Sequence, residues 1–170
     1  MALSRASQVK PIPAWRDEVR RYHDYVAGAL DNFTVSEHAY ALLGAAEAYR
    51  TFGEQADCEL AERAAKLILA KLDPATGNIP AEHYEAPKGE HLVDTIYTLN
   101  WSFLALQMAA ELTGNATIAA AKAKQAELLL SIQDRSDSDF FNGCWRGMFD
   151  LKTKSWGGGN CYEGGAGSIY

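Results

Sequence analysis

The sequence has little positive charge, no long uncharged apolar run and few cysteines, and each deficit excludes a class of protein. Its 16 Lys and Arg residues are outnumbered by 22 Asp and Glu residues, which gives a formal net charge of −6. A chain of this charge without a basic stripe is not expected to bind nucleic acid. No run of roughly 18 apolar residues free of charge is present, as a membrane-spanning helix would require. We therefore expect no nucleic-acid partner and no membrane span.

The cysteines are odd in number and follow no metal-ligand spacing, so we expect no metal site and no cofactor. Cys58 falls in a helical pattern and is interpreted as a small core residue. Cys144 and Cys161 share an irregular tail, and the sequence leaves open whether they pair. The first fifteen residues lack the apolar core of a signal peptide, which leaves the cell compartment open.

Hydrophobic periodicity predicts an all-α protein. Hydrophobic residues make up 48% and charged residues 22% of the 170 residues, as in a single globular domain. Thr34 and Glu37 form a capping-box pattern, Gly53 supplies a left-handed stop, and Asp73-Pro74 ends a further helix. Apolar residues spaced three and four apart predict five helices, at about 14–30, 36–52, 55–72, 90–112 and 116–133.

The sequence contains a repeat with a period of 61 residues. Each of the two copies consists of an inner helix, a glycine turn, an outer helix and an aspartate at which the outer helix ends. The matched pairs are Tyr40 with Trp101, Leu43 with Leu104, Gly53 with Gly114, and Asp73 with Asp134. The same shift carries Trp101 onto Tyr162, where Tyr162-Glu163-Gly164-Gly165 would open a third inner helix.

The helices of this repeat differ in polarity, and the connections between them differ in length. The helix predicted at 90–112 is nearly apolar all round, which is typical of a helix buried on most sides. Those at 55–72 and 116–133 carry a charged face that must meet water. The turns at Gly53 and Gly114 are short, whereas the outer-to-inner connections are long. In an alternating hairpin stack the long connections emerge on one side, where functional residues are expected.

In this pattern the chain resembles the (α/α) toroid of the six-hairpin glycosidase-like proteins. The resemblance rests on paired helices, long loops on one face, and aromatic and acidic residues in those loops. It implies a single α/α-hairpin repeat domain over 1–170 that forms a segment of a larger toroid, because six hairpins close the ring and about two and a half are present. An open arc of this kind would expose apolar inner faces and self-associate.

The first long loop supplies candidate site residues. Glu82 belongs to an acidic and aromatic cluster, and His91 and Asp94 follow at the start of the helix predicted from about residue 90. One interpretation makes Asp94 a catalytic carboxylate at the loop-rich mouth, with His91 and Glu82 binding substrate. The alternative is that Glu90 and Asp94 stabilise the helix end and that His91 is solvated.

The second long loop, near 140–158, is predicted to be irregular or a β-hairpin. Residues 140–150 alternate well enough to form one strand, 151–154 would be the turn, and Ser155-Trp156 the returning strand. Aromatic faces stack on sugar rings while carboxylates and guanidinium groups bind the hydroxyls. The loop therefore offers substrate-binding candidates in Trp145, Arg146, Trp156 and Tyr162.

Cleavage of a glycosidic bond requires two carboxyl groups, one protonated and one ionised. Glu163 is the first candidate for the acid, because a carboxyl group among aromatic residues can have a raised pKa. Asp150 or Asp94 would be its partner. In the alternative interpretation the tryptophans anchor loops over the core and the acids cap turns or pair with basic residues.

These observations favour a carbohydrate-active protein, similar to glycoside hydrolases, that acts on or binds a sugar at the long-loop face. Two other hypotheses remain: a helical-repeat module that binds a protein on its concave face, and an inactive segment of a longer protein. A carbohydrate is accordingly the expected ligand.

Overall fold

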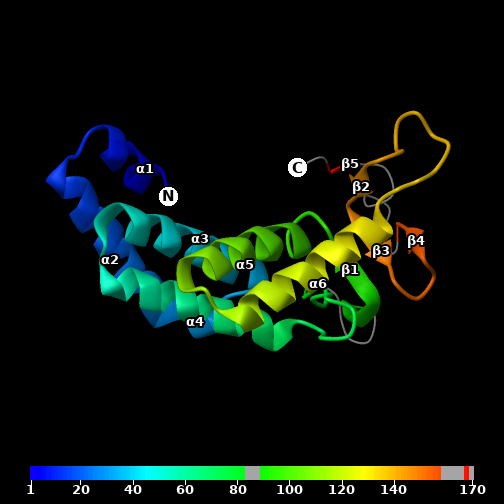
Figure 1. Ribbon diagram of the computed structural model, residues 1–170, viewed down its shortest axis with the longest axis horizontal. Helices are drawn as coiled ribbons and strands as arrows, with labels where there is room; N and C mark the ends of the chain where they lie inside the picture. Colours follow the sequence, from blue (N-terminus) through cyan, green and yellow to red (C-terminus); the bar gives the residue numbers. More distant parts are fainter. Residues whose placement is uncertain (83–88, 158–166, 169–170) are drawn as a thin grey trace. The chain divides into compact units, whose positions relative to one another are not determined.

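The computed structural model describes residues 1–82, 89–157 and 167–168, and over these it is mainly helical with small antiparallel sheets (Figure 1). The chain divides into two compact units. Unit 1 comprises Met1–Ala70 and Leu104–Ala119, and unit 2 comprises Lys71–Phe103 and Ala120–Tyr170. The helices α5 (Leu99–Thr113) and α6 (Ala116–Ile132) contribute residues to both units.

Unit 1 is built from helices that bury small and branched apolar side chains. Besides parts of α5 and α6, it contains α1 (Ala2–Val9), α2 (Pro13–Ala29), the 3-10 turn η1 (Leu30–Asn32), α3 (Val35–Phe52) and most of α4 (Gln55–Lys71). α1 packs against α2 and α3, and α2 packs against α3. α3 is buried almost all round because alanines cover much of its surface, and Leu42 on α3 and Ile68 on α4 are fully buried.

Local sequence signals set the helix ends in this unit. The Thr34 side chain accepts a hydrogen bond from the Glu37 amide while the Glu37 side chain accepts one from the Thr34 amide, so the predicted capping box is confirmed. Gly53 ends α3 at φ +72°, and Gly114 ends α5 at φ +64°. Both glycines therefore adopt the left-handed conformation expected from the repeat. The helices α2, α3, α4 and α6 lie within one residue of their predicted ranges.

The predicted start of the fourth helix is wrong. That helix was expected from about residue 90, but α5 begins at Leu99, after the 3-10 turn η2 (Gly89–His91) and the strand β1 (Leu92–Asp94). The residues of β1 pair with a strand more than 50 residues away, which overrides their helical periodicity. The short helix α1 was not predicted, because its buried face carries Ser4 and Ser7 instead of large apolar residues.

Unit 2 contains a three-stranded antiparallel sheet in the order β1–β3–β4, with β3 at Met148–Asp150 and β4 at Ser155–Trp156. Asp94 is paired with Met148 and Leu92 with Asp150, while Phe149 is paired with Trp156. The predicted hairpin with its turn at 151–154 is confirmed, whereas β1 as a third strand was not anticipated.

A single strand over 140–150 is a wrong prediction. Only β2 (Trp145–Arg146) and β3 are extended, and residues 139–143 form turns. Gly143 has φ +87° and interrupts the alternation. β2 pairs with β5 (Gly167–Ser168) in a separate two-stranded sheet.

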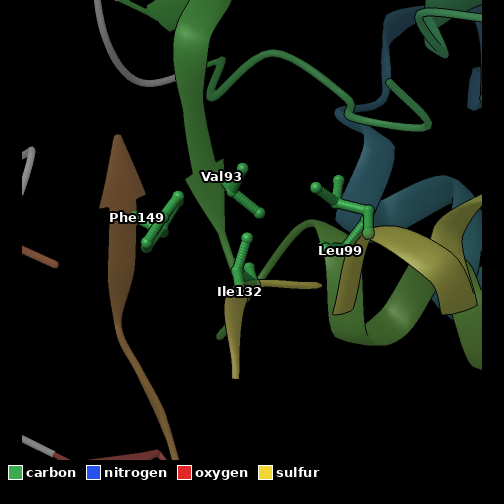
Figure 2. Close-up of a cluster of buried hydrophobic side chains, with 5 residues drawn as sticks. Val93, Leu99, Ile132 and Phe149 are labelled. Carbon is green, nitrogen blue, oxygen red and sulfur yellow. The ribbon is translucent and has the colours of Figure 1, made fainter. Parts of the chain in front are cut away.

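The hydrophobic core of unit 2 lies between the sheet and the helices. Val93 of β1, Phe149 of β3 and Leu99 of α5 pack with Leu128 and Ile132 of α6 (Figure 2). Figure 2 shows the side chains of Val93, Phe149 and Ile132 pointing toward one another. This cluster fixes the position of the sheet relative to the end of α6 within unit 2.

Cys58 differs from its expected position in the core. It is half-buried on α4, and burial together with Glu62 and Glu59 raises the pKa of its thiol. The pairing of Cys144 with Cys161 and the third inner helix at Tyr162 concern residues outside the described part of the chain.

Candidate functional site

Pairing of β1 with β3 brings together candidate residues from the two long loops. His91 immediately precedes β1 and Asp94 ends it. More than 50 positions later, Arg146 ends β2 and Asp150 ends β3. The Leu151 amide donates to the His91 carbonyl over 2.9 Å, which continues the pairing beyond the strands. The sheet thus collects residues that the sequence could only assign to two separate loops.

Asp94 is buried and engaged on both carboxylate oxygens. It is 2% exposed. One oxygen accepts the amides of Ile96 and Tyr97 and the other accepts the Thr98 hydroxyl, all over 3.0 Å. Asp94 was expected on a helix face, but it ends a strand and organises the turn that leads into α5. This geometry favours the stabilising role over the catalytic one, since the described hydrogen bonds occupy the carboxylate.

Arg146 lies between aromatic rings and a buried carboxylate. Its guanidinium carbon is 4.5 Å from the centre of the Phe141 ring and 5.9 Å from that of Trp156. Arg146 Nη2 lies 2.8 Å from Asp134 Oδ2, and the exposed fractions of the two side chains are 22% and 3%. Among the described residues, the buried Arg146 Nε has no hydrogen-bond partner. The guanidinium is therefore fixed in place while part of its donor capacity remains unused.

Asp134 holds this arrangement together. Its carboxylate also accepts the Ser136 amide over 2.8 Å. Hydrogen bonds from Ser136 lower the pKa of Asp134, and Arg146 lowers it further, against the opposing effect of burial. The sequence indicated Asp134 only as a helix stop. Its match to Asp73 in the repeat was a signal that could have shown its importance, because Asp73 likewise accepts the amide of a residue two positions on, Ala75.

The two tryptophans of the second loop are half-buried. Trp145 Nε1 donates to the Leu129 carbonyl over 2.7 Å, so this side chain anchors the loop to α6. The Trp156 and Phe149 rings form a T-shaped pair, with 5.1 Å between ring centres. Trp145 therefore fits the loop-anchor interpretation, while Trp156 shares its surroundings with Arg146.

Asp150 is the half-buried carboxylate at the end of β3. Its Oδ1 atom accepts the amides of Lys152 and Thr153 over 2.7 and 3.2 Å, so both amides share one carboxylate oxygen, whereas the partners of Asp94 use both. Burial acts to raise its pKa, but the hydrogen bonds from Lys152 and Thr153, together with nearby His91, lower the pKa below the ordinary value. An Asp150 carboxylate with a lowered pKa is ionised at neutral pH, as a base or nucleophile requires and an acid does not.

The remaining candidates are Glu82, Tyr162 and Glu163. Glu82 forms an ion pair with Lys71, whose Nζ lies 3.6 Å from Glu82 Oε1. Tyr162 and Glu163 lie outside the described residues. β5, which pairs with Trp145 and Arg146, begins four positions after Glu163.

Over 1–82, 89–157 and 167–168, no three or more His, Cys, Asp and Glu side chains are grouped as metal ligands. Within the same ranges, the helices are too short or too polar to cross a membrane.

Comparisons with known proteins assign no family to this chain. No family model, curated protein or solved structure matches it.

Proposed function

We propose that this chain is a carbohydrate-active protein, similar to glycoside hydrolases of the (α/α) toroid type, that binds a sugar at the sheet of unit 2. The observation that carries the proposal is the Arg146 guanidinium beside the Trp156 ring, 5.9 Å from its centre, together with Asp150 at the end of β3, where nearby His91 helps to lower its pKa. These residues come from both long loops. Arg146 and Trp156 offer a cation beside an aromatic ring, and Asp150 offers a carboxylate on the strand that pairs with β4.

Each part of this group has a function in binding a sugar. A half-buried Trp156 offers part of an aromatic surface to the C–H face of a sugar ring. The Arg146 side chain is 22% exposed and can donate to hydroxyl oxygens, and Asp150 is an acceptor for hydroxyl hydrogens. Asp134 and the Phe141 ring fix the guanidinium, so little conformational entropy is lost when a ligand binds.

The carboxylates divide into supporting and reacting groups in this proposal. Asp94 and Asp134 support the loops through backbone hydrogen bonds. Asp150, ionised at neutral pH, is assigned the role of base or nucleophile. Glu163 is assigned the role of acid, from its position in the sequence among aromatic and glycine residues.

The proposal is tested by titrating the protein with cellohexaose, mannohexaose and an oligogalacturonide, followed by calorimetry and by amide NMR shifts. We expect one of these to bind and to shift amides of β3, β4 and the 151–154 turn. Trp156→Ala should weaken that binding about tenfold, because a stacked ring and its buried area are lost. Tyr25→Ala is the matched control, since Tyr25 is a 70% exposed aromatic residue of unit 1.

Catalysis is tested separately from binding. If Asp150 reacts, Asp150→Asn should abolish release of reducing sugar while the bound sugar still shifts the same amides. Failure of all three oligosaccharides to bind would overturn the proposal, as would equal weakening by Trp156→Ala and Tyr25→Ala. Trp156→Phe provides a second variant if the alanine protein does not fold.

A further inference from the structure

Unit 1 contains a cleft that the proposed sugar site does not use. Its volume is about 390 Å³, in the range of small-molecule sites. It lies among α1, the segment that joins α1 to α2, the start of α2 and the end of α3. All of its lining residues belong to unit 1.

The apolar wall of the cleft is rigid. Ile12 lies between Pro11 and Pro13, whose rings fix the backbone on either side, and Phe52 lines the cleft from the end of α3. Pro13 is also the first residue of α2, so this wall is continuous with a helix of 17 residues. Such a wall can receive a compact apolar group without first being ordered.

Ser7, Gln8 and Thr51 use their side-chain donors within the protein, and the charge of Arg16 is paired with Glu54. The Ser7 hydroxyl donates to the Leu3 carbonyl over 2.9 Å. Gln8 Nε2 lies 2.9 Å from Thr51 Oγ1, and the Thr51 hydroxyl donates to the Glu47 carbonyl over 2.9 Å. Nε of Arg16, which also lines the cleft, donates to Glu54, and Arg20 binds the same carboxylate.

Acceptors at the cleft are not used in this way. Asp17, on α2 beside Arg16, lines the cleft and forms no ion pair or hydrogen bond within the described part of the chain. In the hydrogen bonds of Gln8 the donor is its amide nitrogen, which leaves the side-chain oxygen as an acceptor. A ligand with hydrogen-bond donors and, opposite Asp17, a positive charge therefore complements these acceptors.

We propose that this cleft binds a small organic cation, with its apolar body against Ile12 and Phe52 and its ammonium group at Asp17. The inference does not depend on the proposed carbohydrate function, because it concerns different residues in the other unit. It places a second binding activity on the helical part of the molecule.

The probes for this proposal are three phenyl compounds of similar size: 2-phenylethylamine, 2-phenylethanol and 3-phenylpropionate. Amide NMR titrations of the whole chain should show the amine binding about fivefold more tightly than the alcohol, as expected for one exposed charge pair. The shifted amides should be those of the end of α1, the 10–13 segment and the last turn of α3. The propionate should bind more weakly than the alcohol.

Asp17→Asn should remove the preference for the amine over the alcohol. Glu18→Gln is the matched control, because Glu18 is the neighbouring acid on α2 but does not line the cleft and pairs with Arg21. The proposal is overturned if the alcohol or the propionate binds as tightly as the amine, or if the amine does not bind. It is also overturned if Glu18→Gln and Asp17→Asn have the same effect.

Discussion

Unit 1 and unit 2 are stabilised in different ways. In unit 1 the backbone is satisfied mainly within long helices, and stability comes from close packing of alanine, leucine and isoleucine side chains. In unit 2 much of the backbone lies in turns and short strands. There Asp73, Asp94, Asp134 and Asp150 each accept a backbone amide located two positions ahead. Unit 1 is therefore stabilised mainly by packing between helices, and unit 2 mainly by turns in which an aspartate binds backbone amides.

The largest effect is expected from a cavity in the packed unit. Leu42 is 0% exposed at the centre of α3. Leu42→Ala should lower the free energy of unfolding by about 3 kcal/mol, from lost burial and the cavity left behind. Urea denaturation followed by circular dichroism measures this. Leu130→Ala is the control, since Leu130 is 63% exposed and its loss should cost less than about 0.5 kcal/mol.

The next effect concerns a turn of unit 2. Asp94→Ala removes one acceptor group that serves two amides and a hydroxyl, all next to the start of α5. It should cost about 2 kcal/mol in unfolding free energy. Asp94→Asn keeps an oxygen for the two amides and should cost less. Equal stability of the alanine variant and the parent protein would show that these turns do not stabilise unit 2.

A smaller effect distinguishes two glycines of unit 1. Gly53 has φ +72°, and Gly53→Ala should cost about 1 kcal/mol because a side chain is strained in that conformation. Gly28 lies within α2, and a Cβ there would meet no atom within 4 Å. Gly28→Ala should instead stabilise the protein by about 0.5 kcal/mol. Thermal unfolding of the two variants should therefore shift in opposite directions.

The smallest expected effect is a dependence of the folding stability on pH, which is confined to acidic pH. Folding lowers the pKa of Asp73 through the Thr76 hydroxyl and that of Asp134 through Ser136. A carboxyl group with a lowered pKa stabilises the folded state above its ordinary value of 3.8. That contribution is lost as the pH falls through the lowered value.

In unit 1 the described carboxyl group with a lowered pKa is Glu37, in the capping box of α3. Below pH 4, amide NMR signals of unit 2 should therefore weaken before those of unit 1. Asp134→Asn should reduce the steepness of this acid transition in unit 2. Simultaneous loss of signals from both units would contradict the comparison.

The sequence predicted well where neighbouring residues alone decide the structure. Thr34 and Glu37 are three positions apart, so their reciprocal hydrogen bonds need no distant partner. Gly53 and Gly114 have their left-handed conformation because each follows a helix and lacks a side chain. The hairpin at 148–156 is likewise formed by residues close in the sequence.

The candidate site was only partly predictable. Arg146 and Trp156 were chosen for their chemistry, and they do lie together. The sequence did not indicate that Asp134 would hold Arg146, or that Trp145 would donate its ring N–H to the Leu129 carbonyl. Both contacts join segments whose proximity depends on how α6 and the following loop pack.

Residues 92–98 show where the local sequence alone does not determine the secondary structure. Their apolar spacing suits a helix as well as a strand, and the choice was made by β3, which pairs with Leu92–Asp94 across a long chain separation. By itself the sequence determined the helices α2, α3, α4 and α6, the capping box and the glycine stops, and the chemical types available for a site. Only the tertiary structure decided that Arg146 lies between the Asp134 carboxylate and the aromatic rings, and that β1 pairs with β3, because these contacts join residues distant in the chain.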